Sequence, residues 1–148
     1  MLALVLAAVY DPEIRVLHAL QALMYVGIIW LAGRSNPWGF GAGCLIAAFW
    51  NYTNLFVTDF IKAGIEQLGL LIRTGEVPRP DLLVSLAAAG GHFILIVGCV
   101  AGQLRMRPTA RQWGEFVGGG VIAVGYLILI IITTGQQYIP LVKRVFGM

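Results

Sequence analysis

Charged residues are scarce in this sequence. They make up 11% of its 148 residues, whereas a soluble domain carries about a quarter. At the same time 59% of the residues are hydrophobic, and a disordered chain combines low hydrophobicity with high charge. The composition therefore excludes both an ordinary soluble globule and a disordered chain.

The sequence also lacks the motifs of the commonest catalytic and metal sites. It contains no glycine-rich phosphate loop, no nucleophile elbow, no HExxH motif and no paired carboxylates. Its two cysteines, Cys44 and Cys99, form no CxxC pair and have no histidine at metal-ligand spacing. The basic residues are scattered and form no dense stripe, which argues against a nucleic-acid partner. We therefore expect no enzyme, no metal site and no nucleic-acid binding.

What the sequence has instead is long uncharged runs. Four of them, each of 18 to 27 residues, separate successive charged residues. A helix needs about 20 apolar residues to cross the hydrocarbon layer of a membrane. The runs therefore predict a single membrane domain, residues 1–148, with four spans at about residues 13–32, 38–59, 82–104 and 113–135.

The segment between the second and third of these spans has a different pattern. In residues 60–74, apolar side chains recur at helical spacing while the charged ones lie off that stripe. Such a pattern is typical of an amphipathic helix that lies in the membrane interface. The expected fold class is therefore all-α, an integral membrane four-helix bundle with one interfacial helix.

The two halves of the chain resemble each other. His18 stands 20 residues before the segment 38–43, and His92 stands 21 residues before the similar segment 113–118. This spacing fits a parallel duplication of a two-span hairpin, a construction found in transporters. Chance explains the same matches, because glycine and apolar residues are abundant throughout. Both explanations stay open.

Small residues recur at helical spacing along three of the predicted spans. In lipid such residues let helices approach closely, and the packing contact replaces the hydrophobic force that acts in water. The candidate packing positions are Gly39, Gly43 and Ala47 in the second span, Gly91, Gly98 and Gly102 in the third, and Gly114, Gly118 and Gly125 in the fourth. They predict either tight packing within one monomer or association with a second copy or with other membrane subunits.

Polar side chains also occur within the predicted spans. An unpaired polar group in hydrocarbon costs several kcal/mol, so these side chains need partners. They are His18, Gln21 and Tyr25 in the first span, Asn51 and Asn54 in the second, His92 in the third and Tyr126 in the fourth. If their faces converge, the bundle has a polar centre, which is either a hydrogen-bond network or a path for a small polar solute or a proton.

The two histidines permit a further hypothesis. They are the only two in the chain and stand on spans that are predicted to run parallel. Imidazoles from two helices can hold a b-type haem through its iron, so His18 and His92 are candidate haem ligands. Buried histidines with hydrogen-bond partners are the simpler explanation, and on that explanation there is no cofactor.

These observations favour a small structural or accessory membrane subunit that works through helix packing. A channel or facilitator for a small polar solute is the first alternative, and a haem-binding electron-transfer subunit is the second. We expect a location in a prokaryotic inner membrane, with the lipid bilayer and other copies or subunits as partners. Basic residues are more numerous on the side that carries both termini, which favours cytoplasmic termini. Three basic residues in the short turn 105–111 favour the opposite orientation, because the rule gives short loops more weight. The two indications conflict, and of the two we expect both termini to be cytoplasmic.

Overall fold

Helices account for all the regular secondary structure in this computed structural model, which describes residues 4–6, 9, 13, 15–134 and 139–145; no strand occurs among them. The all-α expectation is therefore confirmed. Positions 14 and 135, at the two ends of the predicted outer spans, lie outside the described residues. The helices are α2 (Arg15–Ala32), α3 (Pro37–Phe56), α4 (Phe60–Thr74), α5 (Pro80–Arg105), α6 (Ala110–Thr134) and α7 (Ile139–Val145).

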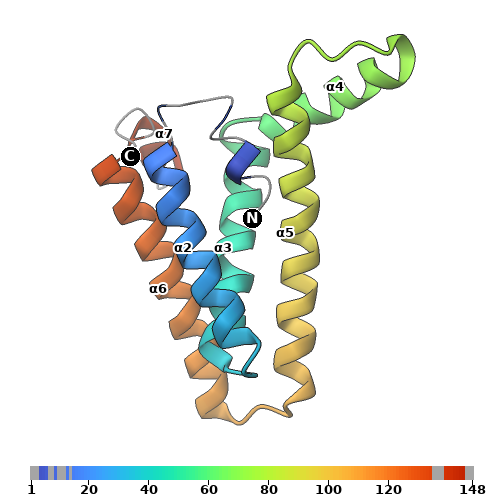
Figure 1. Cartoon of the computed structure of the whole chain (residues 1–148). Coiled ribbons are helices and arrows are strands. Elements are labelled where there is room, and N and C mark those ends of the chain that lie inside the picture. Colours follow the sequence, from blue (N-terminus) through green and yellow to red (C-terminus); the bar gives the residue numbers. More distant parts are fainter. Residues whose placement is uncertain (1–3, 7–8, 10–12, 14, 135–138, 146–148) are drawn as a thin grey trace.

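The four long helices α2, α3, α5 and α6 run side by side, and α4 projects from one end of them (Figure 1). The start of α2 and the end of α6 lie at the same end as α4. The turns at residues 33–36 and 106–109 lie at the opposite end. The molecule thus has an end that carries α4 and an end formed by two short turns.

Local sequence explains where the helices begin and end. At the α2–α3 turn, Asn36 caps α3 because its side-chain oxygen accepts a hydrogen bond from the backbone N–H of Trp38 at 2.9 Å. Pro37 follows at the first helical position, where its missing N–H costs nothing. Gly75 ends α4 in the left-handed conformation, with φ 76°, which glycine adopts without strain.

Three helices, α2, α5 and α6, are long and apolar enough to span a membrane. They support an integral membrane protein with transmembrane helices. Helix α3 has 20 residues but is not one of the three, and its last turns carry the polar residues Asn51, Thr53 and Asn54. The second of the four predicted spans is therefore not confirmed by length and hydropathy.

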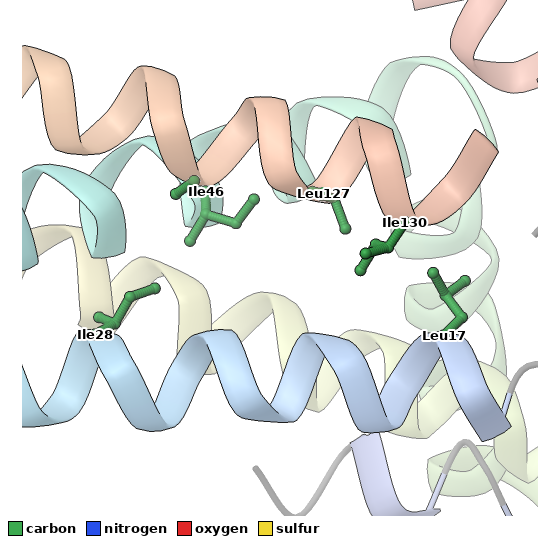
Figure 2. Close-up of a cluster of buried hydrophobic side chains, with 6 residues drawn as sticks. Leu17, Ile28, Ile46, Leu127 and Ile130 are labelled. Atoms are coloured by element: carbon green, nitrogen blue, oxygen red, sulfur yellow. The ribbon is translucent and has the colours of Figure 1, made fainter. Parts of the chain in front are cut away.

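Helix α3 occupies the centre of the packing. It contacts α2, α4, α5 and α6, whereas α5 packs on α3 and α4. Side chains of α2, α3 and α6 form the main buried cluster (Figure 2), which consists of Leu17, Ile28, Ile46, Ala123, Leu127 and Ile130. A second cluster joins α3, α5 and α6 through Phe40, Cys99 and Phe116.

Large apolar side chains also cover the outside of the long helices. Ile94 in α5 is 76% exposed and Ile122 in α6 is 63% exposed. A soluble monomer rarely exposes a contiguous apolar surface of this kind. Lipid chains solvate such a surface without cost, so the exterior agrees with the membrane class.

Candidate functional site

The backbones of α3 and α6 approach each other closely within the first three turns of the two helices. A Cβ atom at Gly41 would lie 1.7 Å from the carbonyl oxygen of Phe116, and one at Gly119 would lie 2.2 Å from that of Trp38. No side chain relieves such a clash, because the obstacle is backbone. Sequence reasoning missed these two glycines and Gly120. The run of three glycines at 118–120 was the available signal, but it does not follow the spacing of a single helix face.

The small residues predicted in α3 pack against the chain's own helices. A Cβ at Gly39 would lie 2.5 Å from the Cβ of Leu31 in α2, and one at Gly43 would lie 2.7 Å from the Sγ of Cys99 in α5. Ala47 is completely buried. These positions therefore let α3 sit close to α2 and α5.

Aromatic rings of α3 pack against two of the predicted glycines on the other helices. The ring of Phe40 covers Gly102, where a Cβ would lie 2.6 Å from its Cε1 atom. The indole of Trp38 covers Gly118, where a Cβ would lie 2.9 Å from its Cζ3 atom. Five of the nine predicted packing positions thus act within the monomer.

The other four predicted glycines have no neighbour of this kind. A Cβ at Gly91 or Gly98 in α5, or at Gly114 or Gly125 in α6, would meet no atom within 4 Å in the described part of the chain. Helices α5 and α6 therefore each have glycines that no other part of the described chain covers.

The uncovered glycines of α5 belong to a continuous exposed strip. We call it the open face of α5, and it consists of Ala87, Gly90, Gly91, Ile94, Val97 and Gly98. The apolar side chains of this face are largely exposed: Ile94 is 76% and Val97 is 68% exposed. A shallow, open depression lies on this face, lined by Phe93, Ile94, Val97 and Gly98.

A group of polar side chains lies where α2, α3 and α5 meet. The hydroxyl of Tyr25 in α2 is 2.6 Å from the Nε2 atom of His92 in α5, and the rings of Trp50 and His92 stack with centroids 4.6 Å apart. Gln21, one turn before Tyr25, is 8% exposed, and Asn51, next to Trp50, is 7% exposed. We call these five residues the polar layer.

The predicted polar residues do not all meet at one centre. Tyr126 lies between α6 and α2, where its hydroxyl donates to the carbonyl oxygen of Leu20 at 3.3 Å. Asn54 has local partners, because its amide donates to the Trp50 carbonyl at 2.9 Å and its oxygen accepts at 3.2 Å from the hydroxyl of Thr58, just after the end of α3. The structure thus brings Tyr25 into contact with His92 and buries Gln21 and Asn51 on the adjoining turns of α2 and α3, whereas Tyr126 lies elsewhere.

The two candidate haem ligands have different surroundings. The Nε2 atom of His92 faces the Tyr25 hydroxyl, and its ring lies against Trp50, so a protein group already occupies that coordinating nitrogen. His18 stands seven residues before Tyr25 on α2, which is about 10 Å along the helix axis. Among the described residues, no three His, Cys, Asp or Glu side chains gather as a metal site would require.

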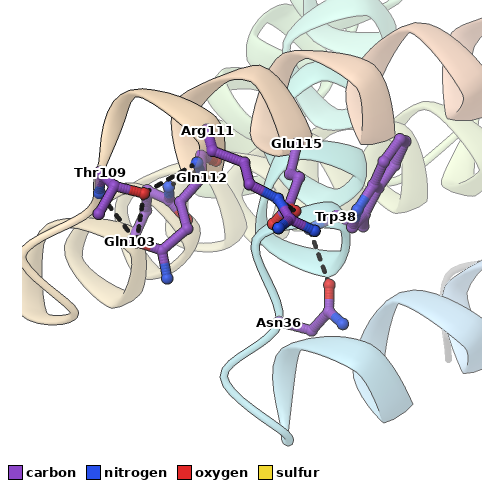
Figure 3. Close-up of polar contacts among 7 residues, drawn as sticks. All are labelled: Asn36, Trp38, Gln103, Thr109, Arg111, Gln112 and Glu115. Atoms are coloured by element: carbon purple, nitrogen blue, oxygen red, sulfur yellow. Dashed lines mark hydrogen bonds and ion pairs between the residues drawn. The ribbon is translucent and has the colours of Figure 1, made fainter.

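The end formed by the two short turns has its own polar contacts (Figure 3). Gln103 is fully buried, and its amide donates to the backbone carbonyl of Gln112 at 3.2 Å. The backbone N–H of Thr109 donates to the side chain of Gln112 at 2.8 Å, and Arg111 forms an ion pair with Glu115 at 3.0 Å. The Gln103 contact ties α5 to the start of α6, and the other two stabilise the start of α6 itself.

No family model, no curated protein and no solved structure matches this chain. Its function is therefore argued from the packing faces and the polar layer alone.

Proposed function

We propose that this chain is a four-span integral membrane protein that works without catalysis, as a packing subunit that pairs with a second copy through the open face of α5. The observation that carries the proposal is the different surroundings of similar glycines. The rings of Phe40 and Trp38 fill the space beside Gly102 and Gly118, whereas nothing in the described chain lies against Gly98. A face of small residues without a neighbour suits another membrane helix.

The proposal includes α3 as the fourth span. Its 20 residues extend for about 30 Å, which matches the thickness of the hydrocarbon layer. Nine of its residues are buried, and α2, α5 and α6 lie around it. A helix that its neighbours shield from lipid can carry Asn51 and Asn54 without exposing them to hydrocarbon.

The duplicated-hairpin arrangement also has support. When one residue, Glu115, is treated as an insertion in the second half, the duplication matches Trp50 in the first half with Tyr126 in the second. Trp50 stacks on His92 of the second half, and Tyr126 donates to Leu20 of the first half. Each aromatic residue thus contacts the first span of the other hairpin. The duplication would place both termini on one side, and the basic residues there favour the cytoplasmic side of an inner membrane.

A second copy suits the open face because the face is complementary to itself. In a two-fold dimer the same patch must meet itself, so it needs both a projection and a recess. Ile94 projects from this face, and the depression beside Gly98 provides the recess. No charged residue occurs between Asp81 and Arg105, so two copies meet there without charge repulsion.

Replacing Gly98 with leucine is expected to convert a dimer into a monomer. The new side chain has room within its own chain, because a Cβ at this position meets nothing within 4 Å of the described residues. The fold should therefore persist while the leucine keeps the second helix away. We expect association to weaken at least about tenfold, equivalent to 1.4 kcal/mol. Native mass spectrometry in mild detergent measures the change.

Two matched variants separate association from folding. Gly114→Leu makes the same change at an open glycine of α6 and should leave the dimer intact. Gly118→Leu drives a side chain into the indole of Trp38 and should reduce the folded yield. A monomeric wild type, or a Gly98→Leu variant that still dimerises like the wild type, would refute the proposal.

A further inference from the structure

Several buried polar atoms of the polar layer have no hydrogen-bond partner within the described part of the chain. They are both side-chain atoms of the Asn51 amide, the Oε1 atom of Gln21 and the Nδ1 atom of His92. Leaving a buried donor or acceptor unpaired costs about 1–3 kcal/mol. Nearly all such groups in native proteins are paired with protein or with ordered water. The polar layer therefore contains several hydrogen-bond donors and acceptors that the described part of the chain does not satisfy.

The unpartnered atoms lie at one level of the packed helices. Ile28 of α2 lies against Gly43 of α3, and the two helices run antiparallel through a short turn. Two helical turns from this contact, α2 reaches Gln21 and α3 reaches Asn51, so the two amides are level with each other. His92 joins them there through its contacts with Tyr25 and Trp50.

The composition of the layer defines the chemistry of a ligand. Asn51 can both donate and accept, Gln21 presents an accepting oxygen, and His92 presents one ring nitrogen. No charged residue occurs in the stretches 16–33, 35–58 and 82–104, which hold all five residues of the layer. An ion would be uncompensated there, and its burial is costly. We infer that the polar layer binds a small neutral molecule that both donates and accepts hydrogen bonds, such as water or a small amide.

Access to this site is from the end that carries α4. Beyond Asn51, Asn54 in α3 and Thr58 just after the end of α3 are hydrogen-bonded to each other and form a polar line towards that end. In the other direction α3 packs tightly, since a Cβ at Gly43 would lie 2.7 Å from Cys99 and 3.1 Å from Ile28. The polar layer is therefore closed on the side of the two short turns, and it does not continue as a channel through the bilayer.

Radiolytic labelling of the purified protein in lipid nanodiscs tests the inference. Hydroxyl radicals formed from bound water modify nearby aromatic side chains, and mass spectrometry locates the products. We expect modification of Tyr25 and Trp50, and a several-fold decrease in the Asn51→Leu variant. Gln21→Leu provides a second variant with the same expected decrease, in case the first does not fold. Gln103→Leu removes a buried amide at the opposite end and should leave labelling of both aromatic residues unchanged.

Adding acetamide distinguishes the two sources of the ligand. If labelling falls as acetamide rises, the site accepts small amides in place of water. If labelling does not change, water is the ligand. Absence of labelling at Tyr25 and Trp50, or equal labelling in wild type, Asn51→Leu and Gln21→Leu, would overturn the inference. None of these outcomes depends on dimerisation.

A cysteine scan tests the closed side in a Cys44→Ser/Cys99→Ser background. A cysteine at Asn54 should react with a water-soluble thiol reagent from the α4 side of sealed vesicles and not from the other side. A cysteine at Ala47, which is fully buried beside the tight packing, should react from neither side. Equal reaction of both cysteines from both sides would show a continuous channel and contradict closure of the polar layer on the side of the two short turns.

Discussion

A Gly41→Ala variant should unfold at a much lower concentration of denaturing detergent than the wild type. The added methyl would lie 1.7 Å from the backbone oxygen of Phe116, so α3 and α6 must separate to admit it. Overpacking costs about 1–3 kcal/mol and occasionally more, and a backbone obstacle places this substitution at the upper end. Circular dichroism during a sodium dodecyl sulfate titration measures the midpoint.

Gly125→Ala is the matched control for this prediction. It adds the same methyl group to α6, at a position where a Cβ meets no described atom within 4 Å. Alanine in a helix is favoured over glycine by up to about 1 kcal/mol, so stability should stay the same or rise slightly. Equal midpoints for Gly41→Ala and wild type would show that α3 and α6 are not in close contact.

An Ile94→Arg variant should fail to insert stably into membranes. Ile94 is 76% exposed near the middle of α5, and no charged residue occurs between Asp81 and Arg105. An arginine at the centre of a membrane helix costs about 2.5–3.5 kcal/mol on insertion scales. We expect a large loss of protein from the carbonate-washed membrane fraction. In a soluble protein the same exposed position would tolerate arginine.

Ile72→Arg controls for the substitution itself. Ile72 is also 76% exposed, but it lies in α4, which projects from one end of the long helices (Figure 1). An arginine there can reach the headgroup region, so the amount in the membrane fraction should change little. If both variants are retained equally, α5 does not cross the hydrocarbon layer.

The class of the fold was predictable from the sequence because it depends on composition and period. Long uncharged runs indicate apolar helices whatever their neighbours are. The central position of α3 was harder to predict from the sequence. Polar residues lower the hydropathy of α3, but the neighbouring helices shield those residues from lipid. A hydropathy value treats each helix as if lipid surrounded it on all sides, whereas α3 is surrounded by α2, α5 and α6.

The sequence could not separate glycines that act inside the monomer from glycines that face outward. Gly98 and Gly102 are four residues apart and share a predicted stripe, yet Gly102 holds the ring of Phe40 and Gly98 meets nothing. Spacing defines a face of one helix. Which part of that face is covered depends on how far a neighbouring helix follows it.

The polar residues show the same limit. Each of them was recognisable as a costly group in a membrane helix, but the partners depend on the rotation of every helix about its axis. Tyr25 meets His92, whereas Tyr126 meets the backbone of Leu20. These pairings join residues 67 and 106 positions apart, which no local pattern encodes.

Cross-linking in the native membrane tests the dimer most directly. In a Cys44→Ser/Cys99→Ser background, a cysteine at Gly98 would face its own copy across the two-fold axis, within the Cα separation of about 4.4–6.8 Å that a disulfide requires. After mild oxidation with copper phenanthroline, we predict a disulfide-linked dimer on a non-reducing gel, and little from the same substitution at Gly125. A Gly98 cysteine that stays monomeric, or that cross-links no more than the Gly125 cysteine, would contradict pairing through the open face of α5.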